Sequence, residues 1–476
     1  MPNDSSPIIV LFRNDLRISD NKALVVAAST NPVIPLFVLD ETSAKMRPIG
    51  AAKRWWLRHS LAALKDSFEK LGTPLILRQG ETQKIVAELV ETTRAAAVFW
   101  NRRYAPSENA ADKDLGAWLH QRGVDTENFD GQLLHDPSRV ATQSGDFYRV
   151  YTPFYKKLAE GEEPRDPIDP PKSLQAFREN LNSDSLESFR LLPKKPDWSG
   201  GLAERWHPGE TGAHERLAKF LENGLDRYAD NRDRPGIAGT SALSPHLAHG
   251  EITPFQIMAA VRGRQGRGAE TFRKELAWRE FSYHLLFHNP ALSEKSFRPE
   301  FEGFKWLSSP AKLQAWRQGK TGYPIVDAGM RELWQTGWMH NRVRMIAASF
   351  LIKDLLIDWR EGEKWFWDTL VDADLANNPA SWQWVAGSGA DAAPYFRIFN
   401  PVLQGEKFDA EGSYVRRYVP ELAKLPNHFL QRPWEAPEQV LADADIELGK
   451  TYPTRIVDHF QSRDRAMRAY QATKDQ

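Results

Sequence analysis

The chain contains no cysteine, no long apolar run and no excess of either charge. Without cysteine it cannot form disulfides, thiolate zinc sites or cysteine nucleophiles, and it fits a reducing compartment. The apolar run at residues 8–12 is too short for a signal peptide or a membrane span, so we expect a cytoplasmic protein without membrane contact. The 63 basic and 63 acidic residues give a formal net charge of +0, so any polyanion must bind to a local patch.

Tryptophan, in contrast, is abundant, and 11 of the 17 tryptophans lie after residue 270. Residues 337–401 combine tryptophans with arginines and with the pair Asp372 and Asp374. Aromatic planes can stack bases or carry electrons, arginines can hold phosphates, and buried acids need a partner. A flavin enzyme that acts on nucleic acid would need all three kinds of residue.

The first part of the chain alternates short apolar runs with helix-like segments. This alternation is typical of a doubly wound parallel sheet, which binds ligands at the carboxyl ends of its strands. A glycine-rich dinucleotide fingerprint is missing, because the loose match at residues 387–392 has no preceding strand. The expected strands are 8–12, 33–39, 74–77 and 95–100, and the expected helices are 22–29, 51–71, 81–92 and 107–121.

Six prolines interrupt the polar stretch 159–200, which we interpret as a linker on the surface. After residue 206 the spacing of apolar residues is helical. We predict an α/β doubly wound parallel-sheet N-terminal domain (1–130), an interdomain linker (131–205) and an all-α C-terminal domain (206–476). The expected helices of the last part are 217–225, 255–262, 271–287, 325–336, 342–358 and 364–370.

Helical spacing places Glu275, Trp278 and Arg279 on one face. They could form a pocket wall on which a base stacks, or a surface ion pair beside a core tryptophan. Arg344 and Asp372 could form a buried ion pair, although Asp372 could also cap a helix.

Other residues also allow two interpretations. The small, hydroxyl-rich segment 239–245 could hold a phosphate at a helix start or act as an N-cap. Tryptophans normally pack in the core, but neighbouring indoles could also pass an electron to a redox cofactor. Six basic residues could form a phosphate-contacting rim or be scattered over the surface: Arg232, Arg342, Arg397, Lys407, Arg416 and Arg417.

Taken together, these segments resemble the photolyase/cryptochrome family over nearly the whole chain. The likeness is greatest to bacterial cyclobutane pyrimidine dimer photolyases, and residues 377–382 suggest the branch called class III. The motifs that carry it are Phe12–Arg17, Thr240–Ser244, Trp278–Phe281, Thr321–Asp327, Trp338–Asn341 and Phe396–Pro401.

The resemblance implies an antenna domain followed by a helical FAD-binding domain. Asn378 should face N5 of the flavin, where plant cryptochromes carry aspartate, and Asp372 should pair with Arg344 beside the ring. Ala242 stands where the family often has arginine. The implied cofactor-binding residues are Tyr228, Thr240, Ser241, Ala242, Leu243, Ser244, Arg279, Asn341, Arg344, Asp372, Asp374 and Asn378.

The resemblance also implies a pocket for a flipped-out lesion. The (6-4) photolyases carry histidines at the positions of Asn341 and Met345, so the residues here favour a cyclobutane dimer. The implied DNA-binding residues are Arg232, Glu275, Trp278, Asn341, Arg342, Met345, Trp384 and Arg397. The implied catalytic residues are Glu275 and Asn378, with Trp382, Trp359 and Trp306 as an electron chain ordered from the flavin to the surface.

The implied activity is light-driven repair of DNA, in which fully reduced, anionic FAD lends an electron to the dimer. We expect a monomer without a metal site. Glu108 should contact an antenna pigment, methenyltetrahydrofolate or else a deazaflavin, although the asparagine and histidine of folate binders are missing at Ser107 and around residues 43–47. The rival interpretation is a cryptochrome, a blue-light photoreceptor without repair activity.

Overall fold

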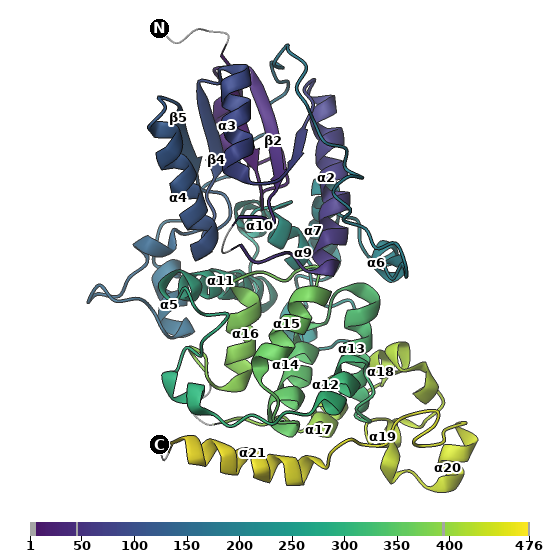
Figure 1. The fold of residues 1–476 in the computed structure, drawn as a ribbon. Helices are drawn as coiled ribbons and strands as arrows, with labels where there is room; N and C mark the ends of the chain where they lie inside the picture. Colours follow the sequence, from purple (N-terminus) through teal and green to yellow (C-terminus); the bar gives the residue numbers. More distant parts are fainter. Residues whose placement is uncertain (1–5, 44–45, 393–395, 475–476) are drawn as a thin grey trace.

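A parallel sheet and its helices lie above a larger helical half (Figure 1). The computed structural model describes residues 6–43, 46–392 and 396–474. All strand pairs of the five-stranded sheet are parallel, in the order β3-β2-β1-β4-β5. The strands are β1 (Ile8–Phe12), β2 (Val33–Leu39), β3 (Ile76–Gln79), β4 (Ala97–Asn101) and β5 (Asp125–Phe129), and the helices between them are α1 (Lys22–Ala28), α2 (Ala51–Lys70), α3 (Thr82–Thr93) and α4 (Pro106–His120).

Both faces of the sheet are buried, because successive side chains of a strand point to opposite faces. Val10 and Phe12 of β1 pack with apolar residues of α1 and α2, whereas Ile9 and Leu11 pack with those of α3 and α4. The predicted doubly wound domain is therefore confirmed. Strand β5 was not expected from the sequence, because its residues are mostly polar and exposed at the edge of the sheet.

The proline-rich segment 159–200 does not simply lie on the surface as expected. Ala176 forms a parallel bridge with Val33, and four apolar side chains of the segment are buried in the core on one face of the sheet. Their burial removes apolar area from water, which outweighs the polar character of the segment. These side chains are Leu174, Leu186, Phe189 and Leu191.

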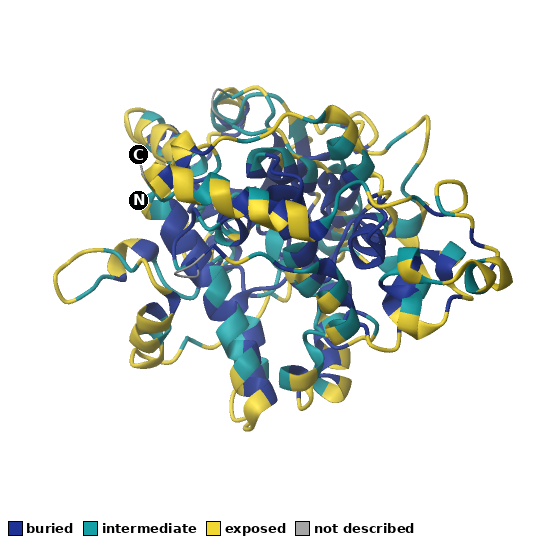
Figure 2. Cartoon of the chain, turned by 90° about the horizontal axis from the view of Figure 1, so that it is seen from below, coloured by how far each residue is buried: buried dark blue, intermediate teal, exposed yellow. Residues whose placement is uncertain are grey.

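The rest of the chain is helical, and buried residues fill its centre while exposed residues form the outer loops (Figure 2). No helix in the described ranges is both long and apolar enough to cross a membrane. The helices are α5 (Tyr151–Ala159), α6 (Gly200–Arg205), α7 (Glu210–Asn223), α8 (Tyr228–Asn231), α9 (Ser244–His249), α10 (Pro254–Val261), α11 (Arg267–His288), α12 (Pro310–Arg317), α13 (Pro324–Thr336), α14 (Asn341–Ser349), α15 (Trp359–Thr369), α16 (Asn377–Ala386), α17 (Pro401–Phe408), α18 (Ser413–Tyr418), α19 (Asn427–Leu430), α20 (Glu438–Asp443) and α21 (His459–Lys474).

The single helix expected at 342–358 is wrong in its extent. Helix α14 ends at Ser349, and a π-helical turn follows at Phe350–Asp354. Leu356 then adopts a left-handed conformation, and Asp358 caps α15 by accepting from the backbone N–H of Arg360. The wider turn presents Asp354 to His459 of α21 at 2.6 Å, so a tertiary contact accompanies the interruption.

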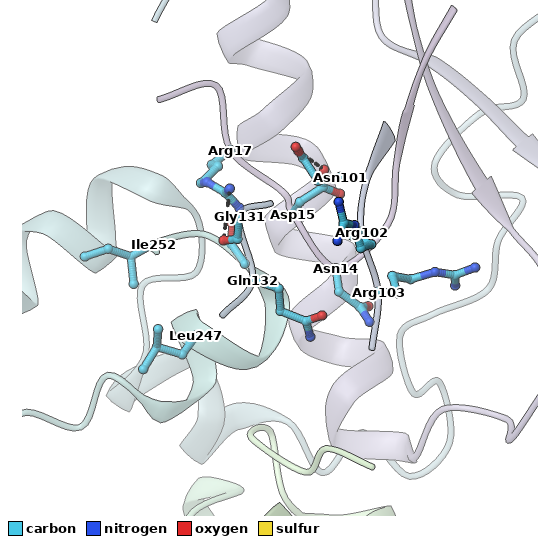
Figure 3. A pocket seen from close by; sticks show the side chains of 11 residues that line it. Asn14, Asp15, Arg17, Asn101, Arg102, Arg103, Gly131, Gln132, Leu247 and Ile252 are labelled. Atoms are coloured by element: carbon cyan, nitrogen blue, oxygen red, sulfur yellow. Dashed lines mark hydrogen bonds between the residues drawn. The ribbon is translucent and has the colours of Figure 1, made fainter. Parts of the chain in front are cut away.

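The sheet domain and the helical half meet around the buried side chain of Arg17 (Figure 3). Its guanidinium donates to the carbonyl oxygens of Asp20 and Gly250, both at 2.9 Å, and reaches that of Gly131 at 3.5 Å. One side chain thus joins the sheet domain, the connecting segment and the loop after α9. Gly250 has a φ of 65°, and an added Cβ would lie 2.0 Å from the carbonyl oxygen of Asn14.

We therefore expect Gly250→Ala to destabilise the protein by about 2 kcal/mol or more, since strain and a backbone clash add together. Gly72→Ala is the matched control, because Gly72 also has a positive φ but has nothing within 4 Å of an added Cβ. Urea denaturation of both variants measures the difference. Equal midpoints for the two variants would show that the contact with Asn14 is not tight.

Candidate functional site

A cavity of about 520 Å³ opens in the helical half and is lined by residues of α8, α9, α11, α14, α16 and the loop before α16. Most residues predicted for the cofactor and the substrate line it, although they come from distant parts of the sequence. They are Tyr228, Arg232, Ser241, Leu243, Ser244, Glu275, Trp278, Arg279, Asn341, Arg342, Arg344, Met345, Asp372, Asp374, Asn378, Trp382 and Trp384.

The predicted pair of Arg344 and Asp372 is present in the cavity wall. The Nη2 of Arg344 donates to Oδ2 of Asp372 at 2.8 Å, and the hydroxyl of Ser244 donates to the same oxygen at 2.6 Å. Arg344 also donates through Nε to the carbonyl oxygen of Met339. The Oδ1 of Asp372 is buried and has no hydrogen-bond partner among the described residues. Buried acceptors in proteins are normally hydrogen-bonded. The unpaired Oδ1 is therefore available to accept a hydrogen bond from a ligand.

Asp374 and Asn378 form the next part of the wall. Asp374 accepts hydrogen bonds from the backbone N–H groups of Ala376 and Asn377 at the start of α16. The side-chain nitrogen of Asn378 donates to Oε1 of Glu363 at 2.8 Å and to the backbone oxygen of Glu363 at 3.1 Å. Because the amide nitrogen is held by Glu363, the amide oxygen remains for the cavity.

Glu275 pairs with Arg232 at the cavity wall. Burial raises the pKa of Glu275 above its usual range, while the charge of Arg232 opposes the rise. The carboxyl group is therefore closer to accepting a proton than an ordinary glutamate, and a protonated carboxyl can donate a hydrogen bond.

Trp278 lies flat against Tyr151 of α5, with 3.7 Å between the ring centroids and 5° between the planes. The hydroxyl of Tyr151 donates to the carbonyl oxygen of Lys274 at 2.7 Å, which fixes the phenol ring. Tyr151 was not expected at this site from the sequence. Its place in the connecting segment, far from the motifs of the helical half, explains why spacing could not reveal it.

Three tryptophans predicted as an electron chain share one apolar core, in which Trp359 is 0% and Trp382 is 2% exposed and Trp306 is partly buried. Gly362 allows Trp382 to approach α15, because an added Cβ would lie 2.1 Å from its ring. Trp382 has Phe366 and Trp316 as ring neighbours, at 4.9 and 6.2 Å. Trp306 is thus the least buried of the three, and the electron chain stays a prediction.

Several predicted residues lie outside the cavity lining. Thr240 and Ala242 belong to the loop before α9, where Ala242 packs against the tryptophans of a neighbouring core. Arg397 is exposed, its guanidinium lies over the ring of Phe399, and its carbonyl oxygen accepts from the buried amine of Lys353. The predicted contact of Arg397 with DNA stays a prediction.

Glu108, predicted to contact an antenna pigment, lies in a second cavity of about 560 Å³ at the carboxyl ends of β1 and β2. Its carboxylate accepts from the side-chain amide of Asn14 at 3.1 Å and lies 3.7 Å from Arg103. This edge of a doubly wound sheet is where ligands usually bind. Of the segment 43–47, which lacks the histidine of folate binders, residues 44–45 lie outside the described ranges.

Comparison with known proteins agrees with this architecture. The family model described as DNA photolyase matches residues 8–172, and the model described as the FAD binding domain of DNA photolyase matches residues 272–472. The chain is 54% identical over 475 residues to the deoxyribodipyrimidine photo-lyase of Agrobacterium fabrum, covering 99% of this chain and 98% of the relative. It is 37% identical to cryptochrome-2 of Arabidopsis thaliana, covering 98% of this chain and 79% of the relative.

Among solved structures, a bacterial class III photolyase from Agrobacterium tumefaciens superimposes with a TM-score of 0.97 at 53% identity, covering 100% of this chain and 99% of the other. The chain therefore belongs to the photolyase/cryptochrome family, and within it to the DNA photolyases. The predicted family and class of enzyme are confirmed, and the helical half is an FAD-binding domain.

The residues of the first cavity, in the helical half, fit FAD. The free Oδ1 of Asp372 can accept from a donor of the cofactor, and the guanidinium of Arg344 supplies a fixed positive charge beside it. Replacing Arg344 would leave a buried carboxylate without its ion pair, which is strongly unfavourable.

We expect Arg344→Leu to lower the fraction of protein that retains FAD after gel filtration by about tenfold, since breaking a buried pair costs at least ~1.4 kcal/mol. Arg331→Leu is the control, because Arg331 pairs with Glu421 away from the cavity. The ratio of flavin to protein absorbance measures the loss. Normal retention of FAD by Arg344→Leu would contradict the assigned role.

Proposed function

We propose that this protein is a light-dependent DNA photolyase that repairs cyclobutane pyrimidine dimers, acting as a monomer in the cytoplasm. The observation that carries the proposal is the composition of one cavity wall. It combines the pair of Arg344 and Asp372 and the amide of Asn378 with Glu275, Trp278 and Trp384. The ion pair and the amide suit a flavin. The glutamate and the two tryptophans suit a pyrimidine pair taken out of the DNA double helix.

In this proposal Tyr228, Ser241 and Ser244 lie toward the phosphates of FAD. Arg344 and Asp372 hold the edge of the ring system, and Asn378 directs its amide oxygen toward N5. Arg344, Asp372 and Asn378 would thus hold a fully reduced, anionic FAD, which would supply light-driven transfer of one electron to the dimer and back, with no net redox change.

The protein has to hold the lesion outside the double helix. Photolyases extrude their target bases, which costs a few kcal/mol and less at a damaged step. Stacking on Trp278 and Trp384 would offset this cost by roughly 1–3 kcal/mol for each base. Tyr151 supports this role, because it covers one face of the Trp278 indole and keeps its plane fixed.

Glu275 is proposed to contact the dimer and to stabilise the charge that it receives. The raised pKa supports a carboxyl group that donates a hydrogen bond to a carbonyl oxygen of the pyrimidine. Arg232 and Arg342 now pair with Glu275 and Asp233, and we propose that both turn to the phosphates of the backbone when DNA binds. Arg397, which is already exposed, would extend this contact.

The second cavity is proposed to hold an antenna pigment beside Glu108. We favour methenyltetrahydrofolate over a deazaflavin because the resemblance points to the folate-binding branch. The buried charges of Arg103 and Lys53 in this cavity are compatible with an acidic ligand.

A cryptochrome function is the second candidate, because the chain is also 37% identical to a plant cryptochrome. A photoreceptor would reduce its flavin in light but leave thymine dimers unchanged. Asn378 favours repair, since plant cryptochromes carry aspartate at this position.

Illumination of the reduced protein with an oligonucleotide that carries a thymine dimer tests the proposal. We expect the thymine absorbance to recover, and no recovery would favour the photoreceptor.

Glu275→Ala should lower the repair yield by about threefold to tenfold while changing lesion affinity less, because a charge-assisted hydrogen bond to the dimer is lost while the dimer is being split. Glu270→Ala, an exposed change on the same helix, is the control. An unchanged yield in Glu275→Ala would argue against its role.

Trp306→Phe separates the electron chain from repair. Phenylalanine keeps the packing on Phe304, whose ring lies 4.3 Å from that of Trp306, but it is much harder to oxidise. We therefore expect photoreduction of the oxidised protein to fail, while repair by chemically reduced protein remains at the wild-type level. Trp118→Phe in α4 is the control. Loss of both activities would show that Trp306 is a structural residue.

A further inference from the structure

The two cavities share a wall that is built by both domains. Arg47 and Lys53 line the second cavity from the sheet domain, whereas Ala373 and Asn378 line the first cavity from the helical half. Across the boundary, the side chain of Arg47 reaches α15, and that of Lys53 reaches the segment before α16. The wall therefore joins the loop after β2 to the place where we propose that the flavin binds.

Arg47 makes the more specific of the two contacts. Its guanidinium donates two hydrogen bonds to the carboxylate of Glu363, at 2.7 and 2.9 Å, and lies 4.0 Å above the ring of Trp367. Glu363 is 2% exposed. A paired geometry of this kind fixes both the position and the orientation of a carboxylate.

The same carboxylate holds Asn378. Oε1 of Glu363 accepts from Nη1 of Arg47 and also from the side-chain nitrogen of Asn378, at 2.8 Å. Among the described residues, the ion pair of Glu363 is with Arg47. If this cation is removed, the buried carboxylate loses its ion-pair partner and can turn away. The amide of Asn378 then keeps only its hydrogen bond to the backbone oxygen of Glu363 and is held less firmly.

Lys53 supports the same wall. Its buried amine donates to the carbonyl oxygen of Ala373 at 2.9 Å, between Asp372 and Asp374. Trp367, which lies beneath Arg47, donates through Nε1 to the carbonyl oxygen of Pro48. The sheet domain thus contacts both α15 and the segment before α16.

We propose that Arg47 is a positioning residue that acts across the domain boundary, through Glu363, on the amide of Asn378. This inference rests on the proposed function, in which Asn378 faces N5 of the flavin. The amide oxygen then points to N5 because Glu363 holds the amide nitrogen, and the two hydrogen bonds from Arg47 keep the carboxylate of Glu363 in place. The redox properties of the flavin consequently depend on a residue that also lines the antenna cavity.

The test uses the FAD-bound protein and the rate at which the fully reduced flavin is oxidised in air. Arg47→Met should raise this rate by about threefold to tenfold, within the range of coupling between residues of one hydrogen-bond network. Arg47→Lys keeps the charge but not the planar fork, so we expect an intermediate rate. Arg58→Met is the control. Arg58 also pairs with a glutamate far along the same chain, the exposed Glu187, but it lies away from both cavities.

A double-mutant cycle distinguishes positioning from general destabilisation. In an Asn378→Ala background, Arg47→Met should change the oxidation rate no further, because the amide through which it acts is missing. A purely structural role would give the same additional change in both backgrounds. The proposal is overturned if Arg47→Met and Arg58→Met give the same oxidation rate. It is also overturned if the effects of Arg47→Met and Asn378→Ala on this rate are additive.

If Arg47→Met does not fold or does not retain FAD, Arg47→Lys decides. A wild-type rate in Arg47→Lys overturns the proposal, and a raised rate that disappears in the Asn378→Ala background supports it. Repair by the wild-type protein is measured in parallel. Failure of wild-type repair counts against the proposed function, whereas normal repair with unchanged oxidation of the Arg47 variants counts against this inference alone.

Discussion

The buried carboxylate of Asp372 is the charge around which the cavity of the helical half is organised. A carboxylate removed from water needs an opposite charge and hydrogen-bond donors, and Arg344 and Ser244 supply them from α14 and α9. These contacts occupy only one of its two oxygens. The other oxygen is left for a ligand, so the same arrangement that makes the charge tolerable also defines one edge of the binding site.

Similar compensation extends to the sheet domain. Glu363 is buried between Arg47 and Asn378, and the amine of Lys53 is buried against the carbonyl oxygen of Ala373. Charged groups therefore connect the two domains at the cavity wall, where an apolar contact would leave their relative orientation less defined. This wall separates the proposed flavin site from the proposed antenna site, so its geometry matters to both.

Sequence patterns were sufficient for the general architecture. Apolar runs predicted four of the five strands, because both faces of these strands are buried and require apolar residues. They missed β5, whose residues are exposed at the edge of the sheet. Helical spacing also could not show that α14 ends at Ser349, since Leu356 leaves the helical conformation and Asp354 pairs with His459 far along the chain.

The sequence by itself determined the family, the class of fold and about half of the residues that line the first cavity, because motifs such as Trp278–Phe281 and Trp338–Asn341 are local. Only the tertiary structure decided which of these residues contact one another. Tyr151 on Trp278, Arg232 on Glu275 and Arg47 on Glu363 join residues that are 43 or more positions apart. Such pairs depend on how helices and loops are packed, and no spacing in the sequence encodes the distance between two side chains that meet only after folding.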